Sequence, residues 1–406
     1  MPLTACGTSS PAAAQAPSDA GTGADVDDAA TPTEDAAVDA PFAPGSHPAT
    51  PTVTNSGGSV LAAPKVVTVS FASDPLAAQL DAFAQAVGAS AYWESATHEY
   101  GVGPLGFARS VHVAAAPSAS IDSTALESWL ISQLDGTHAE WGTPDASTIY
   151  TIVYPVGMTI TMSGQSICSS SPAYHSEVTL GSGTTVPYAA MAQCGSFQGL
   201  SGIDYVTGGL SHEWVEASTD PFPNSSPAYY GPPPRYNDWA IVTGGELADM
   251  CTILPDVYFQ PTGLPFTVQR TWSNAAASAG HDPCVPAPVA PYFNAAPVMP
   301  DTLHGSYFGQ SITSEGLEIA IGQSKAVEVD LFSDAKTQGP WAVRAVAFGA
   351  EKLTFAWSAM QGSNGDKLEL TVTRVKDDPD VTGVDLFAIV STLGTDEHAW
   401  VGAIGD

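Results

Sequence analysis

Two short runs of the chain constrain its fold most, because both are strongly apolar. They are KVVTVSF (65–71) and STIYTIVYP (147–155), and such runs are typical of strands buried on both faces. Between them lie two helical patterns, one that begins near Ser73 and one over 122–134, each with an apolar stripe. Helices that alternate with buried strands predict an α/β (or α+β) core.

The segment LSHEWVEASTDP (210–221) contains the first half of the metal-binding motif His-Glu-x-x-His. A helix over 205–218 would place His212 and Glu216 one turn apart on one face, where both can bind one metal ion. Zinc accepts a carboxylate oxygen in place of the second imidazole. Glu213 then occupies the position of the general base in zinc peptidases. We therefore predict a Zn²⁺ site with Glu213 as the catalytic residue.

A third ligand is expected from GGELADMC (244–251). Glu246 and Asp249 are three residues apart, on one face of an expected short helix. We assign Glu246 to the metal and Asp249 to the support of His212, as in thermolysin-like sites, although the reverse assignment is open. His175 is an alternative ligand or hydrogen-bond donor. The competing interpretation is a metal-free carboxylate pair around a buried histidine.

Five cysteines divide into one near the start of the chain and four farther on. The four suggest two disulfides in an exported protein. Sequence allows three connectivities, and we favour Cys168–Cys194 with Cys251–Cys284, because each pair closes a local loop.

The sequence around Cys6 resembles the end of a bacterial lipoprotein signal, with small residues before the cysteine to be lipidated. Residues 7–58 are rich in Ala, Pro, Thr and Asp and predict a disordered acidic linker. We expect residues 1–6 to be a truncated signal end. The chain is then a bacterial lipoprotein, held at the cell envelope through Cys6, or an extracellular protein.

The sequence pattern changes in the C-terminal part, after a Pro/Ala linker that we expect at 286–301. Residues 302–406 contain short β-type runs separated by turn signals such as GSNGD, which is typical of a β-sandwich. The predicted order is therefore a metallohydrolase domain over 59–285 with a zincin-like fold, followed by an all-β sandwich as an accessory domain.

The charge of the chain argues against two classes of partner. With 42 acidic and 11 basic residues, its formal net charge is −31, and such a field repels nucleic acid and anionic membrane surfaces. We expect a monomer whose partner is a peptide or cell-wall substrate.

Four blocks of the sequence together resemble one known family. YWESATHEYGVG (92–103), the Cys168–Cys194 segment, SHEWVEASTDP and GGELADMC are similar to the EXORDIUM / phosphate-induced protein family of plants and its bacterial exported relatives with an HExxE helix. The resemblance covers about 60–285 and leaves the C-terminal module unrecognised. It implies an extracellular, cell-wall-associated protein with a metal-dependent hydrolase core.

These observations predict an exported, lipid-anchored, zinc-dependent hydrolase, most specifically a metallopeptidase. The alternative is a non-catalytic cell-surface or cell-wall binding protein whose acidic cluster is structural.

Overall fold

The computed structural model describes residues 41–406, except positions 170, 289, 308, 350–351, 377–380 and 406. Cys6 and residues 7–40 of the expected linker lie outside the described residues. Among the residues that are described, no helix is both long and apolar enough to cross a lipid bilayer.

A five-stranded sheet contains both of the apolar runs. They form β2 (Lys65–Phe71) and β5 (Thr148–Tyr154), which pair in parallel. The sheet order is β3-β2-β5-β9-β8, with β3 at Gly106–Val113, β9 at Thr185–Ala192 and β8 at Ala173–Thr179. Only β8, at one edge, runs antiparallel to its neighbour in this sheet. Nearly every residue of β2 and β5 is buried, as a strand covered on both faces requires.

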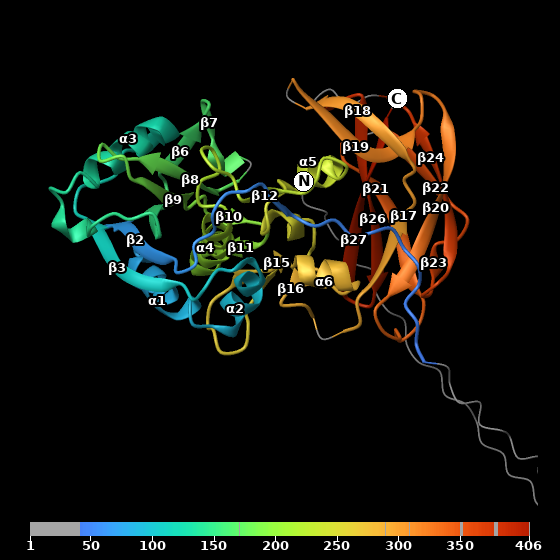
Figure 1. Cartoon of the computed structure of the whole chain (residues 1–406), viewed down its shortest axis with the longest axis horizontal. Helices are drawn as coiled ribbons and strands as arrows, with labels where there is room; N and C mark the ends of the chain where they lie inside the picture. The colour runs from blue at the N-terminus through green and yellow to red at the C-terminus, as the bar shows by residue number, and fades with distance from the viewer. Residues whose placement is uncertain are drawn as a thin grey trace, which may run out of the picture. The chain divides into compact units, whose positions relative to one another are not determined.

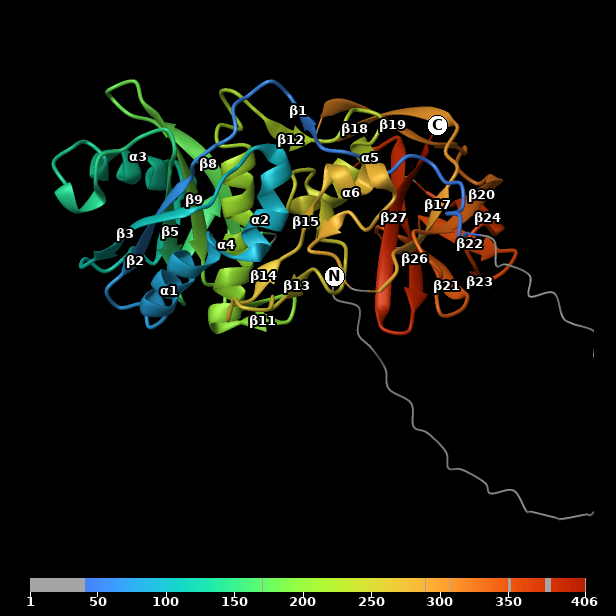
Figure 2. The same ribbon diagram turned by 60° about the horizontal axis from the view of Figure 1, so that its bottom comes forward.

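Helices lie on both faces of this sheet. One face packs against α1 (Ala77–Val87), α2 (Ala91–Thr97) and α4 (Gly202–Thr219), and the other packs against α3 (Ser123–Gln133). Figure 1 shows α3 and α1 on opposite sides of the strands, and Figure 2 shows α4 beside β8 and β9. The predicted helices over 122–134 and 205–218 are therefore confirmed.

The C-terminal part is a β-sandwich, as predicted. Its two sheets enclose a core that includes Phe293, Trp341 and Phe387. The first sheet has the order β17 (Phe293–Pro297), β20 (Ser324–Ser333), β24 (Lys367–Arg374) and β22 (Leu353–Trp357). The second has the order β23 (Gln361–Gly362), β21 (Trp341–Ala347), β26 (Val384–Leu393), β27 (Asp396–Gly405), β19 (Gln310–Glu318), β18 (Asp301–Tyr307) and β25 (Val381–Thr382).

The rest of the chain forms small sheets and short helices. A three-stranded sheet contains β4 (Ser120–Asp122), β6 (Thr159–Met162) and β7 (Gln165–Ser166). Two-stranded sheets pair β1 (Thr54–Asn55) with β12 (Tyr229–Gly231), β10 (Ser196–Phe197) with β11 (Leu200–Ser201), β13 (Tyr258–Phe259) with β14 (Val268–Gln269), and β15 (Thr271–Trp272) with β16 (Cys284–Val285). The short helices are α5 (Asn237–Thr243), α6 (Asn274–Ala279) and the 3₁₀ turns η1 (His98–Tyr100), η2 (Ala139–Trp141), η3 (Ile167–Ser169) and η4 (Asp249–Cys251).

The expected fold class, an α/β (or α+β) zincin-like catalytic domain, is wrong. The described part of the chain is mostly β, with 39% of the described residues in strands and 20% in helices. The expectation extended the pattern of 65–155 to the whole of 59–285. Much of that range instead forms two-residue strand pairs within Gly- and Pro-rich loops, and pairs this short leave no periodic signal in a sequence.

Both expected linkers are shorter than the sequence suggested. The ring of His47 stacks on Phe332, with centroids 3.7 Å apart. Trp272 Nε1 donates to the backbone oxygen of Pro51 at 3.2 Å, and β1 follows at Thr54. Residues 43–58 are therefore part of the packed structure, and β17 begins inside the range 286–301 that was expected to be a linker. A buried carbonyl or aromatic contact of this kind has no composition signature, which is why the Ala/Pro-rich runs were misassigned.

Candidate functional site

Helix α4 presents two different faces because of the residues that surround its motif. Trp214 is fully buried against the sheet, where its Nε1 donates to Thr151 Oγ1 at 2.7 Å and its ring stacks on Phe83. This contact fixes the rotation of the helix about its axis. His212, Glu213 and Glu216 consequently face away from Phe83 and toward β8 and the segment that precedes η4.

The side chain of Gln269, a residue outside any recognised sequence motif, holds His212 in one orientation. His212 Nδ1 lies 3.1 Å from Gln269 Oε1, and Gln269 Nε2 donates to the backbone oxygen of Ala248 at 2.7 Å. Because the amide nitrogen is engaged there, Gln269 presents its oxygen to His212, and Nδ1 of the imidazole is the donor. Nε2 therefore faces Glu216 Oε2 at 3.0 Å and Asp249 Oδ1 at 3.5 Å.

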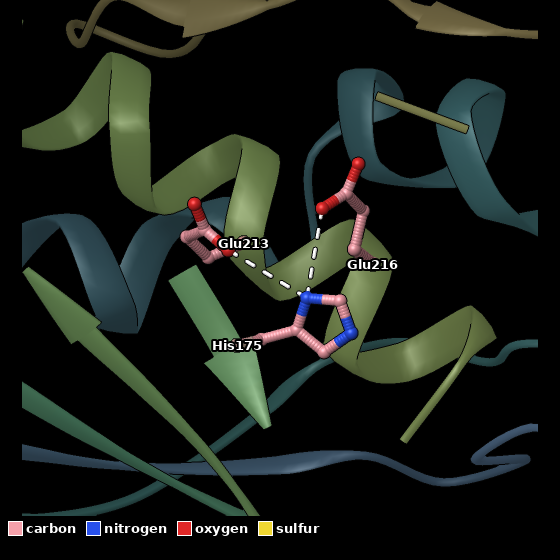
Figure 3. A group of neighbouring side chains, drawn as sticks. All are labelled: His175, Glu213 and Glu216. Carbon is pink, nitrogen blue, oxygen red and sulfur yellow. Dashed lines mark ion pairs between the residues drawn. The ribbon is translucent and has the colours of Figure 1, made fainter. Parts of the chain in front are cut away.

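His175 lies on β8 and points between the two glutamates of α4, as Figure 3 shows. Its Nδ1 is 3.7 Å from Glu213 Oε2 and 3.6 Å from Glu216 Oε2. Its Nε2 is 3.6 Å from Glu246 Oε1. The side chain of His175 is only 4% exposed, so it belongs to the centre of the cluster rather than to its edge.

The segment around Glu246 and Asp249 is a turn followed by the 3₁₀ helix η4, which corrects the expected short helix. Gly244 allows this turn. Its φ is +120°, and a Cβ there would lie 2.0 Å from Asp249 Oδ2, so a side chain at this position would displace the Asp249 carboxylate.

The structure separates the two acidic residues of this segment. Asp249 lies beside His212, whereas Glu246 lies beside His175. The geometry thus groups His212 and Glu216 with Asp249, and favours the reverse of the assignment that we made from the sequence. The backbone N–H of Asp249 also donates to Glu216 Oε1 at 3.2 Å, which ties the segment to α4.

Three groups of side chains are close enough to hold a metal ion, with ligand atoms within 4.8 Å of one another among the described residues. The groups are His212 with Glu216 and Asp249, His175 with Asp220 and Glu246, and His175 with Glu213 and Glu216. Glu216 and His175 each belong to two groups. The predicted ligands therefore do converge, but around two histidines instead of one.

The electrostatics of the cluster follow from burial and from these contacts. Burial alone would lower the pKa of His212, but the carboxylates of Glu216, Glu213 and Asp249 outweigh it and raise this pKa well above its ordinary value. The pKa of His175 is raised in the same way, against its burial, by Glu246, Glu213 and Glu216. Burial would raise the pKa of Glu216, but the two imidazoles lower it to about 2. Burial and the nearby Glu216 raise the pKa of Asp249 to about 8.

Two cavities open onto the cluster. One, of about 620 Å³, is lined by His212, Glu213, Asp249 and apolar side chains that include Tyr258. The other, of about 480 Å³, is lined by both histidines and by Glu213, Glu216 and Glu246. Glu213 lies on both cavities. Volumes of this size suit a small ligand or a short stretch of polymer.

The two predicted disulfides are confirmed. Cys251 bonds to Cys284 and so anchors η4, the helix that begins at Asp249. Cys168 bonds to Cys194 and closes the loop that contains β8. Disulfides of this kind fit an extracellular protein.

Two residues of the cluster have no place in the assignment made from the sequence. Asp220 follows the last turn of α4 and is fully buried beside His175 and Glu246. In the sequence it lies in Thr219-Asp220-Pro221, a pattern typical of the end of a helix and not of a metal ligand. Gln269 lies in β14, in a stretch without any motif, so only the tertiary structure reveals its contact with His212.

Comparisons with known proteins do not identify a family. No family model matches the chain, and no curated protein sequence matches it. Among solved structures, domains 5–6 of the S-layer protein SbsC are 18% identical over 27% of this chain, with a TM-score of 0.18, and the match spans 44% of that structure. Domains 4 and 5 of SbsC are 17% identical over 36% of this chain and 89% of theirs, with a TM-score of 0.17. Titin M4 is 10% identical over 22% of this chain and 84% of its own, with a TM-score of 0.15. Likenesses this weak carry no argument about function.

Proposed function

We propose that this chain is an exported metal-dependent hydrolase whose metal is bound by His212, Glu216 and Asp249. One observation carries the proposal: both ring nitrogens of His212 face oxygen atoms. Gln269 Oε1 accepts from Nδ1, and Nε2 faces Glu216 Oε2 at 3.0 Å and Asp249 Oδ1 at 3.5 Å. A neutral imidazole that faces two carboxylates with its lone pair requires either a second proton or a cation.

The donor set fits zinc. With tetrahedral zinc–ligand bonds of about 2.0–2.2 Å, neighbouring ligand atoms lie about 3.3–3.6 Å apart. The 3.5 Å between His212 Nε2 and Asp249 Oδ1 falls in this range, and the 3.0 Å between His212 Nε2 and Glu216 Oε2 is slightly shorter. Gln269 would accept from Nδ1 and so orient the imidazole, as the hydrogen-bond partners of metal-binding histidines do.

Glu213 is placed to act as the general base. Its side chain is 5% exposed, next to His212 on α4, and it lines both cavities. A bound zinc would supply the polarisation of a scissile carbonyl and the activation of water. Glu213 would accept the proton of the attacking water, and His175 Nδ1, 3.7 Å away, would orient its carboxylate. A peptide is the proposed substrate, because the cavity beside Tyr258 is lined by apolar side chains as well as by His212, Glu213 and Asp249.

Two further statements belong to this proposal. The sequence resemblance supports membership of the EXORDIUM / phosphate-induced protein family and its bacterial relatives over about 60–285. The sequence around Cys6 supports a bacterial lipoprotein, which mass spectrometry of the N-terminal peptide from the native host would test by the mass of attached lipid.

The test of the hydrolase is metal analysis combined with Glu213→Gln. We expect purified protein to contain zinc that a chelator removes, and Glu213→Gln to retain this zinc while hydrolysis of a peptide library falls at least about 100-fold. Glu140→Gln is the matched control, because Glu140 is 61% exposed on η2, and it should hydrolyse as the unaltered protein does.

The second candidate is a non-catalytic surface protein with a metal-free cluster. The raised pKa values of His175 and His212 favour it, since two imidazolium ions would balance part of the negative charge. Protein that is folded, binds no zinc when zinc is added and hydrolyses no peptide would support this candidate and refute the hydrolase.

A further inference from the structure

His175 Nε2 and the oxygen atoms around it form a second set of potential ligands, separate from the His212 site. This Nε2 lies 3.6 Å from Glu246 Oε1 and 3.2 Å from the backbone oxygen of Asp220. Nδ1 of His175 faces Glu213 and Glu216 on the opposite edge of the ring. Both ring nitrogens therefore face oxygen atoms, as they do in His212.

Asp220 supplies an independent observation. The residue is fully buried, and its Oδ1 accepts from the backbone N–H of Ala228 at 2.6 Å. Its Oδ2 has no hydrogen-bond partner among the residues that the structure describes, and neither has Glu246 Oε1. One carboxylate oxygen of each residue and a ring nitrogen of His175 lie within 4.8 Å of one another. Unpaired carboxylate oxygens are costly to bury unless a proton or a cation satisfies them.

The charge of the cluster points the same way. Five carboxyl groups lie here, from Glu213, Glu216, Asp220, Glu246 and Asp249. Ion pairs to them within the described part of the chain come from His175 and His212. With all five carboxyl groups ionised, two imidazolium ions leave −5 + 2 = −3, so the cluster needs further protons or cations to balance its charge. Two divalent cations with neutral imidazoles leave −5 + 4 = −1 while every carboxyl group stays ionised.

We propose that a second divalent cation binds between His175 Nε2, Asp220 Oδ2 and Glu246 Oε1, in addition to the cation proposed at His212. The inference deepens the proposed function, because Glu216 links the two sites. Glu216 is a proposed ligand of the first site, and its Oε2 also lies 3.6 Å from Nδ1 of His175, the imidazole of the second site. The mixed nitrogen and oxygen donors suit Zn²⁺ or Mn²⁺.

The second cation has a structural role that follows from its ligands. They come from β8, from the end of α4 and from the turn before η4, so one cation joins three segments that are distant in sequence. It also fixes the His175 ring, whose Nδ1 then holds the Glu213 and Glu216 carboxylates in position. His175 is thus a positioning residue for Glu213.

The experiment is a metal count on the full chain, loaded with Zn²⁺ alone or Mn²⁺ alone and then dialysed. We expect two equivalents per chain in the unaltered protein and one in Asp220→Asn. Glu246→Gln should also bind one equivalent. Because Glu246 is 15% exposed whereas Asp220 is fully buried, this second variant disturbs folding less and separates loss of the site from misfolding. Asp282→Asn is the matched control: Asp282 is 6% exposed, lies outside the cluster and caps the N–H of Cys284, and two equivalents should remain.

Asp249→Asn separates the two proposals. If both are right, it loses the other equivalent and keeps the one that Asp220→Asn removes. If only the second site exists, the unaltered protein binds one equivalent, which Asp220→Asn abolishes and Asp249→Asn does not. A metal content that neither Asp220→Asn nor Glu246→Gln reduces would overturn the second site and leave the hydrolase proposal standing.

Discussion

Gln269 Oε1 lies 3.1 Å from His212 Nδ1, and this contact decides which nitrogen of the imidazole faces the carboxylates. Gln269 is itself fully buried, with its amide nitrogen engaged by the backbone oxygen of Ala248. The orientation of the proposed zinc ligand is therefore set by a residue 57 positions away in the chain.

Replacement of Gln269 tests that orientation. In Gln269→Met the side chain keeps its length but loses the acceptor oxygen, so we expect zinc to bind about 10–100-fold more weakly at the His212 site. Competition with a chromophoric chelator measures this affinity. Gln193→Met is the matched control, because Gln193 is also buried and donates to Asp74 instead. Equal affinities in the two variants would show that Gln269 does not position His212.

The disulfide between Cys251 and Cys284 should affect both stability and the site. Loss of this bond in Cys251→Ala/Cys284→Ala should cost about 3–4 kcal/mol of unfolding free energy, as expected for a loop of this length. It should also weaken zinc binding at His212, because Cys251 ends the 3₁₀ helix that starts at Asp249.

The second disulfide serves as the comparison. Cys168→Ala/Cys194→Ala removes a bond that closes a similar loop, with a sequence separation of 26 against 33. We expect a similar loss of unfolding free energy in denaturant titrations, but a smaller effect on the His212 site. The idea that Cys251 holds Asp249 fails if the two double variants bind zinc at His212 with the same affinity.

Asp238 predicts a pH dependence of stability. Burial raises the pKa of this carboxyl from 3.8 to about 7, against the hydrogen bond from Ser314. The folded chain therefore holds the proton more tightly than the unfolded chain. The contribution of this carboxyl to the unfolding free energy is therefore greatest below about pH 4. It falls by at most about 4 kcal/mol as pH rises from about 4 to 7.

The variant Asp238→Asn removes the titrating group and keeps an oxygen that can accept from Ser314. Urea titrations at pH 5 and pH 8 should show that the variant gains stability relative to the unaltered protein at the higher pH. The prediction is wrong if the difference between the two proteins is the same at both pH values.

The sequence predicted the site in part because the chemistry of a helix is local. The spacing of His212 and Glu216 places them on one face of any helix that contains them, and α4 spans both. The pairing of the cysteines was also recoverable, since short loops close most easily. Glu246 and Asp249 were predicted because the proposed site required a third ligand and these two acidic residues lie three apart in one short segment.

The sequence could not predict that Asp249 lies beside His212 whereas Glu246 lies beside His175. This arrangement depends on Gly244, where a Cβ would collide with the Asp249 carboxylate, and on β8, an edge strand that brings His175 between Glu213 and Glu216. The fold class was missed because two-residue strands such as β14 are defined by their partners, not by their own residues.

The amino-acid order alone therefore determined the buried strands 65–71 and 147–155, the shared face of His212 and Glu216 on α4, both disulfides and the β-rich C-terminal part, because each depends on periodicity or on short loops. The tertiary structure decided which carboxylate meets which imidazole, because side chains from β8, α4, β14 and the turn before η4 meet only after long loops have closed. Contacts of that kind depend on packing and on buried charge, and neither is encoded in any single stretch of the chain.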